Sequence, residues 1–347
     1  MKLQNISRRE FIKLSGLGLA GLFLPPLNFH FDDPFASQQG RVTSRIAWMY
    51  DQPSAQATQI KICHRDMLVN ITNTAISDDT TSHNRVWYEI GTDGIREGFL
   101  YSGNIQPVKT ILNIPPKEII IPEIGLLAEI SVPFTDAHEE ADKSSEVAYR
   151  MYYETVHWVK DIVTNKEGQV WYQIYDDKWN KFYYARAEHI RIMSESELAP
   201  ISPTIPNKLK KIIVQLESQL VTAYEDGQQV FAASASTGGV YRVGTYTTPK
   251  GNFTTDYKRP SRHMAAGDIA SSGFDLPGVP WVQYITESGI SFHGTYWHND
   301  FGRPRSHGCI NLTSSAAKWL YRWTTPAVPF EKEFSYGGIG TKVEIVL

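Results

Sequence analysis

Two segments of the chain repeat the same order of residue types. Residues 86–108 (VWYEIGTDGIREGFLYSGNIQPV) can be aligned with residues 170–192 (VWYQIYDDKWNKFYYARAEHIRI). Each begins with Val-Trp-Tyr, passes through a turn rich in Asp or Gly, and reaches an Ile about 18 residues after the Trp. An alternating apolar and polar stretch precedes each copy, near residues 41–73 and 126–163. Short alternating strands with polar turns predict a small β structure used twice, with two unrelated hairpins as the alternative.

The repeated pattern resembles bacterial SH3-like domains, which commonly accompany cell-wall enzymes. We predict two SH3-like β-barrels, at residues 40–110 and 123–196. The resemblance implies that these copies bind the cell-wall polymer. A proline-rich segment at residues 194–208 precedes a third region, residues 207–347. This linker predicts that the third region folds without the two copies and keeps activity on small substrates.

The third region is predicted to be β-rich with one helix, which makes the whole chain mainly β. Residues 211–216, 219–236 and 341–347 alternate apolar and polar side chains. Asp226-Gly227 stands where a tight hairpin turn needs positive φ. The segment TSSAAKWLYRW has apolar residues at helical spacing, with Ser314 as the expected N-cap.

The N-terminus has the layout of an export signal at residues 1–37. Basic residues that include Arg8 and Arg9 precede an apolar run of 11 residues. That run is too short to span a hydrocarbon core of ~30 Å as a helix. The paired arginines resemble a twin-arginine signal, with cleavage near Ala36 or Ser37; a short amphipathic helix is the alternative. The protein is therefore expected outside the cytoplasmic membrane, in the cell wall or periplasm.

Charge and cysteine content narrow the possible partners. The net charge of −3 shows no basic excess, so we expect no nucleic-acid partner. Export implies an oxidising setting, in which Cys63 and Cys309 could form a disulfide. Their spacing does not establish a bridge, because the two residues lie in different predicted domains.

Cys309 lies in the segment RSHGCINL and has four possible roles. Burial as an apolar filler is disfavoured, since the surrounding loop is rich in Gly, Pro, Asn, Asp and Arg. A zinc site could use Cys309 with His293, His298 and His307, but the short paired spacing of zinc ligands is missing. The third role is the nucleophile of a papain-like cysteine peptidase. In those peptidases the Cys precedes its His, whereas here His293 comes first, and this order argues against that role.

The fourth role rests on a long ordered pattern. His293-Gly294, then eleven residues, then SHGCIN at residues 306–311 resemble the active-site signature of L,D-transpeptidases with a YkuD-like catalytic domain. The resemblance extends over about residues 210–347 and includes ASTGG, TTPKGNF and the terminal GTKVEIVL. We expect Cys309 to be the nucleophile, with neither metal nor cofactor.

The resemblance assigns roles to the neighbouring residues. It implies that His293 is the base and that the Gly294 carbonyl orients its ring. The backbone N–H groups of Gly308 and Cys309 are expected to form the oxyanion hole. Ser306, His307 and Asn311 are expected to shape the loop or hold substrate. Two further loop residues, Arg303 and Arg305, could bind a carboxylate of the substrate, although exposed arginines often have no such role.

The substrate that the resemblance implies is the stem peptide of peptidoglycan. Cys309 would attack the carbonyl of the third residue, expel the terminal D-alanine and pass the acyl group to a neighbouring stem, which gives a 3→3 cross-link. An L,D-carboxypeptidase or a peptidase that cleaves cross-links would use the same residues. A non-catalytic wall-binding protein is a further alternative. The sequence does not identify the acceptor, the diamino acid of the stem or the redox state of Cys63.

Overall fold

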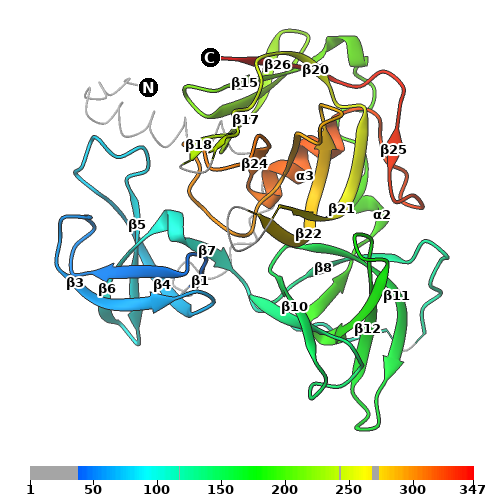
Figure 1. Ribbon diagram of the computed structural model, residues 1–347, viewed down its shortest axis with the longest axis horizontal. Coiled ribbons are helices and arrows are strands. Elements are labelled where there is room, and N and C mark those ends of the chain that lie inside the picture. The colour runs from blue at the N-terminus through cyan, green and yellow to red at the C-terminus, as the bar shows by residue number, and fades with distance from the viewer. Residues whose placement is uncertain (1–37, 117, 242–243, 268–272) are drawn as a thin grey trace, which may run out of the picture.

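The computed structural model describes residues 38–116, 118–241, 244–267 and 273–347. The expected signal segment at residues 1–37, with its cleavage site, lies outside this part of the chain. The described chain is mainly β, as predicted: two N-terminal antiparallel sheets precede a β-rich domain with one longer helix (Figure 1). Among the described residues, none of the helices is long and apolar enough to cross a membrane.

The first N-terminal unit, residues 38–108, is a seven-stranded antiparallel sheet in the order β3-β2-β6-β5-β4-β1-β7. Its strands are β1 (Gln38–Val42), β2 (Ile46–Tyr50), β3 (Gln59–His64), β4 (Leu68–Ile76), β5 (Val86–Thr92), β6 (Ile95–Tyr101) and β7 (Ile105–Val108). A 3₁₀ turn, η1 (Ser102–Asn104), comes directly before the last strand.

The second N-terminal unit, residues 126–192, has seven strands in the order β10-β9-β13-β12-β11-β8-β14. These are β8 (Leu126–Ile130), β9 (Phe134–His138), β10 (Val147–Tyr152), β11 (Val156–Thr164), β12 (Val170–Asp176), β13 (Lys181–Arg186) and β14 (Ile190–Ile192). Here too a 3₁₀ turn, η2 (Ala187–His189), precedes the last strand.

The two units have the same strand order when each is numbered from its own first strand. The repeated Val-Trp-Tyr begins β5 in one and β12 in the other, and both Trp87 and Trp171 are buried. The aligned sequence segments thus occupy equivalent places in two copies of one topology. Their membership of the SH3-like class stays a prediction.

The C-terminal domain contains two five-stranded sheets and a hairpin. One sheet runs β17-β16-β15-β26-β20 and the other β24-β23-β22-β21-β25. The strands are β15 (Lys210–Gln215), β16 (Leu220–Glu225), β17 (Gln228–Ser234), β18 (Val240–Tyr241), β19 (Gly244–Thr245), β20 (Gly251–Thr254), β21 (Tyr257–Ala266), β22 (Phe274–Tyr284), β23 (Ser291–Gly294), β24 (Ile310–Leu312), β25 (Ser335–Tyr336) and β26 (Lys342–Val346). The expected turn at Asp226-Gly227 joins β16 to β17, and both residues have positive φ, +47° and +79°.

The predicted helix is α3 (Ser314–Trp323), which packs against β22 and β23. Its N-cap is Thr313, and the expectation of Ser314 was wrong by one residue. The Thr313 side chain accepts a hydrogen bond from the Ala316 N–H at 3.2 Å, whereas Ser314 has already entered the first turn.

The proline-rich linker suggested that the C-terminal domain is separate from the second unit. In the structure the two share a buried core. Leu127, Val156, Trp158 and Met193 belong to the same buried cluster as the core of that domain. The linker begins with a short helix, α2 (Glu195–Leu198), and lies against α3. There the Ile201 N–H donates to the Arg322 carbonyl and Arg322 Nε donates to the Ala199 carbonyl.

Candidate active site

Two adjacent parallel strands position the expected base and nucleophile. β23 pairs with β24 so that His293 lies opposite Asn311. Cys309 immediately precedes β24. Because side chains alternate along strands, Cys309 and His293 project from the same face, two residues apart in register. The strand pair therefore brings together two residues that are separated by a long loop in the sequence.

His293 is buried, with 3% of its surface exposed. Its Nδ1 lies 3.0 Å from the Gly294 carbonyl oxygen, so this nitrogen carries a proton and donates it. Burial lowers the pKa of His293 to about 4, against the opposing effect of this hydrogen bond. The ring is thus neutral near pH 7, and Nε2 is left as the proton acceptor. A side chain at position 294 would lie 2.7 Å from Pro280 Cγ, so glycine permits this close packing.

Cys309 is partly exposed, and its sulfur contacts a serine that the sequence reasoning missed. Ser291 Oγ lies 3.7 Å from Cys309 Sγ, and the Gly289 carbonyl lies at 3.8 Å. Burial raises the pKa of Cys309, while hydrogen bonds from Ser291 act in the opposite direction. Ser291 precedes His293 by two positions, so its place on the same strand face was the available signal.

The turn before Cys309 is held by its own hydrogen bonds. Ser306 Oγ donates to the Cys309 carbonyl at 2.5 Å and accepts from the Gly308 N–H at 3.1 Å. The Gly308 carbonyl accepts from Thr248 Oγ1 at 2.7 Å. Gly308 has φ +112°, a conformation that favours glycine. In this geometry the Gly308 N–H already has a partner, and it must leave Ser306 to bind an oxyanion.

His307 is exposed and lies among aromatic rings. It stacks on Tyr241, with ring centroids 5.5 Å apart, and meets the edge of Tyr246 at 4.4 Å. Phe274 is a third ring neighbour at 5.8 Å. These contacts place His307 at the rim of the cleft.

Asn311 and His298 form a second buried pair beside the nucleophile strand. The Asn311 side-chain amide lies 3.1 Å from His298 Nε2, and the Asp300 N–H donates to His298 Nδ1 at 3.2 Å. Burial, together with the charge of Arg305, lowers the pKa of His298 to about 3. Within the described residues, no group of three or more His, Cys, Asp or Glu side chains is arranged to hold a metal ion. Both cysteines are free thiols.

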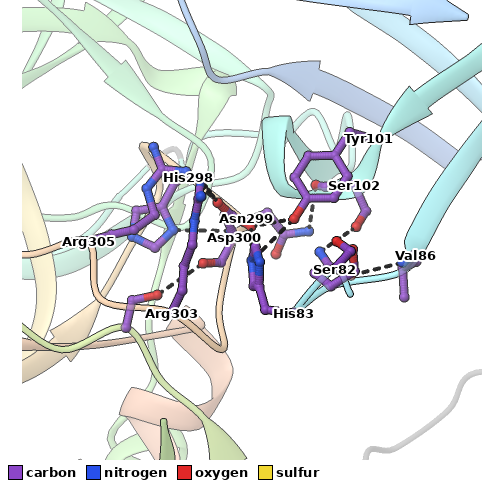
Figure 2. Close-up of polar contacts among 12 residues, drawn as sticks. Ser82, His83, Val86, Tyr101, Ser102, His298, Asn299, Asp300, Arg303 and Arg305 are labelled. Carbon is purple, nitrogen blue, oxygen red and sulfur yellow. Dashed lines mark hydrogen bonds and ion pairs between the residues drawn. The ribbon is translucent and has the colours of Figure 1, made fainter. Parts of the chain in front are cut away.

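The two arginines suggested by the sequence meet at one carboxylate, Asp300 (Figure 2). Arg303 and Arg305 both pair with Asp300 Oδ2. The other oxygen accepts from Tyr101 Oη at 2.7 Å and His83 Nε2 at 2.9 Å, both from the first N-terminal unit. Burial raises the pKa of Asp300, but these hydrogen bonds and positive charges outweigh it and lower the pKa to about 2.

A cleft of about 800 Å³ opens over the thiol and the imidazole. Cys309, His293 and His307 line it, as do Trp297 and Arg305. Further residues of the catalytic domain line it, and the two N-terminal units supply another part of its wall. The first contributes Arg41, Thr43 and Arg65, and the second contributes Tyr149, Arg150 and Tyr152. The volume lies within the range of clefts that bind small molecules and peptides.

Residues 209–345 match the family model of the L,D-transpeptidase catalytic domain, YkuD. This match identifies the C-terminal region, which is less than half of the chain, as an L,D-transpeptidase catalytic domain, as the SHGCIN signature predicted. Enzymes of this family are cysteine acyltransferases that act on peptidoglycan stem peptides outside the cytoplasm. The two N-terminal units have no such assignment.

Among known proteins, the chain is 28% identical over 130 residues to YciB of Bacillus subtilis, which is assigned to the L,D-transpeptidases. The match covers 34% of this chain and 63% of that protein, which is less than two thirds of its length. An L,D-transpeptidase from Mycobacterium smegmatis is 23% identical, with 40% of this chain and 59% of the other covered and a TM-score of 0.33. L,D-transpeptidase 3 of Mycobacterium tuberculosis is 20% identical, with 56% and 74% covered and a TM-score of 0.32.

Proposed function

We propose that this protein is a peptidoglycan L,D-transpeptidase that forms 3→3 cross-links through a thioester on Cys309. The observation that carries the proposal is the pairing of β23 with β24, which puts Cys309 and a neutral His293 on one face at a common cleft. The donor is a tetrapeptide stem and the acceptor is an amine on a neighbouring stem.

The first half-reaction forms the thioester. The Cys309 sulfur bonds to the carbonyl carbon of the third stem residue while His293 Nε2 takes the thiol proton. The bond to the terminal D-alanine then breaks, and the departing amine takes that proton from His293. The low pKa of His293, about 4, keeps the ring unprotonated at the start. The raised pKa of Cys309 favours a neutral thiol at rest, so the proton moves during attack.

The second half-reaction transfers the acyl group. The acceptor amine attacks the thioester carbonyl, His293 takes a proton from that amine, and the sulfur leaves and regains the proton. Ser291 supports the sulfur at both stages, since a hydroxyl can donate to a thiolate. The N–H groups of Cys309 and Gly308 are the proposed oxyanion donors, with the Gly308 N–H exchanging Ser306 for the oxyanion.

The same proposal predicts where the enzyme acts. Export by the twin-arginine route, directed by Arg8 and Arg9, would deliver the protein to the wall or periplasm. The N-terminal units would then add contacts to the wall polymer.

Two alternative functions are to be distinguished from this proposal. An L,D-carboxypeptidase or a peptidase that cleaves cross-links differs only in the acceptor, which is then water. A non-catalytic wall-binding protein is disfavoured by the complete Cys309 and His293 pair. Mass spectrometry of muropeptides after incubation with defined tetrapeptide stems separates these outcomes. A cross-linked dimer supports the proposal, tripeptide alone shows carboxypeptidase activity, and unchanged tetrapeptide contradicts both of these assignments.

A further inference from the structure

The cleft over Cys309 has a wall that belongs to neither sheet of the catalytic domain. Arg41, on β1 of the first N-terminal unit, is 2% exposed and donates to Gln106 and to the Tyr296 carbonyl of the catalytic domain. Its guanidinium lies 4.1 Å from the ring centroid of Tyr152, in the second unit. Tyr152 in turn stacks on Tyr296 with ring centroids 5.2 Å apart. Three parts of the chain therefore meet at a fixed contact on the edge of the cleft.

Most charges along this wall are balanced. Arg41 pairs with Asp66 at 2.9 Å. Arg150 pairs with the other oxygen of Asp66 at 3.1 Å and with Asp136 at 2.8 Å. Arg305, which lines the cleft from the catalytic domain, is paired with Asp300. Among the described residues, the one carboxylate that lines the cleft is that of Asp275, which contacts the His263 ring. Each of these groups is already compensated by an opposite charge or a hydrogen bond.

Arg65 is different. It lines the same cleft from the turn between β3 and β4, and its side chain is exposed. Within the described part of the chain, no carboxylate pairs with it, and the neighbouring Asp66 pairs with Arg41 and Arg150 instead. An uncompensated guanidinium in a cleft attracts an anion, and a carboxylate matches its planar donor geometry.

We propose that Arg65 binds a carboxylate of the stem peptide that takes no part in the reaction, which makes the first N-terminal unit a part of the substrate site. The inference rests on the proposed function, because it assumes a stem-peptide donor. Besides the carboxylate of the departing D-alanine, a tetrapeptide stem offers two others. One belongs to the second residue, and the other to the third residue when that residue is a diaminopimelate. The N-terminal unit then selects the donor rather than only anchoring the enzyme to the wall.

Binding of synthetic tetrapeptide stems to the full chain tests the proposal, with Cys309→Ser as the background so that no turnover occurs. Three stems are compared: one with both carboxylates free, one amidated at the second residue and one amidated at the third. Arg65→Gln is expected to weaken binding of the free stem about tenfold, the size of one exposed charge-assisted contact. The stem amidated at the recognised carboxylate should bind with equally low affinity to the Cys309→Ser protein with and without Arg65→Gln. This comparison identifies the carboxylate that Arg65 binds.

Arg45→Gln is the matched control, since Arg45 is an exposed arginine of the same unit that does not line the cleft. It should leave all three dissociation constants unchanged, and Arg65→Lys should restore part of the loss. Equal affinity of Arg65→Gln and its parent for the free stem would overturn the proposal. So would the same loss on all three stems. Because binding is measured without turnover, a failure of the transpeptidase assignment appears separately, in the muropeptide assay.

Discussion

Tyr101 Oη donates a hydrogen bond of 2.7 Å to the buried carboxylate of Asp300, which joins the first N-terminal unit to the loop that precedes the nucleophile (Figure 2). Asp300 is fully buried. From Asp300 a path of contacts continues through its N–H to His298 and from His298 to Asn311 on β24. Asn311 follows Cys309 by two positions. The N-terminal unit therefore helps to hold the strand that presents the nucleophile.

Tyr101→Phe is expected to weaken this connection without removing a ring. A hydrogen bond to a charged group contributes about 1.5–3 kcal/mol, so the free energy of unfolding should fall by about that amount. If Tyr101 also positions the nucleophile strand, kcat should fall several-fold while KM for a stem peptide changes little. The measurements are denaturant unfolding and steady-state kinetics.

Tyr50→Phe is the control for that variant, because the hydrogen bond of the Tyr50 hydroxyl within the described chain is an exposed one, from Gln59 at 3.4 Å. Tyr50→Phe should leave the free energy of unfolding and kcat near those of the wild type. A loss of stability in Tyr101→Phe with an unchanged kcat would reduce Tyr101 to a structural role.

The sequence predicted those features that depend on neighbouring residues. Alternation and turn residues indicated β structure in both N-terminal units and the turn at Asp226-Gly227. The signature selected Cys309 and His293 as the candidate pair, and their catalytic roles stay a prediction. Contacts between distant segments were missed. Tyr101 and Asp300 are 199 positions apart, and no local pattern marks a carboxylate that four side chains will surround. For the same reason Arg303 and Arg305 looked available for substrate, although both pair with Asp300.

The two histidines of the signature should differ in their effect on the thiol. His293→Ala removes the proposed base, so turnover should fall by ~10²–10⁴-fold. Alkylation of Cys309 by iodoacetamide at neutral pH should also slow, and most of the rate should return at high pH, where hydroxide ionises the thiol. His307→Ala should lower turnover on peptide but keep the alkylation profile, since His307 contacts Tyr241 and Tyr246. A shifted profile in His307→Ala alone would reverse the two roles.

The pH dependence of acylation gives an independent test of the burial of His293. Because its pKa is lowered to about 4, the ring stays neutral above that pH and becomes unable to accept a proton only below it. The acid limb of the rate of Cys309 acylation should therefore lie near pH 4. A solvent-exposed imidazole would give a limb near about pH 6.5. Single-turnover rates between pH 3 and 8 distinguish the two, provided that circular dichroism shows a folded protein over the range.

Deletion of the N-terminal units should destabilise the catalytic domain, in contrast to what the proline-rich linker suggests. A chain that begins at Asn207 lacks Leu127, Val156, Trp158 and Met193, which share the buried core of that domain. Their loss exposes apolar surface, at about 25 cal/mol per Å². The truncated chain should unfold at lower denaturant concentration than a chain that begins at residue 118, which keeps the second unit. Equal midpoints would show that the catalytic domain folds independently.

Covalent labelling distinguishes the two thiols. A carbapenem presents a strained carbonyl to a nucleophile, and the family resemblance implies that Cys309 is acylated by it. The mass of the intact protein should rise by one drug equivalent, and Cys309→Ser should show no increase. Cys63→Ala should be labelled like the wild type, because Cys63 is fully buried in the core of the first N-terminal unit and cannot reach the drug. Peptide mapping after digestion locates the adduct. An adduct on Cys63, or one that persists in Cys309→Ser, would contradict the assignment of Cys309 as the nucleophile.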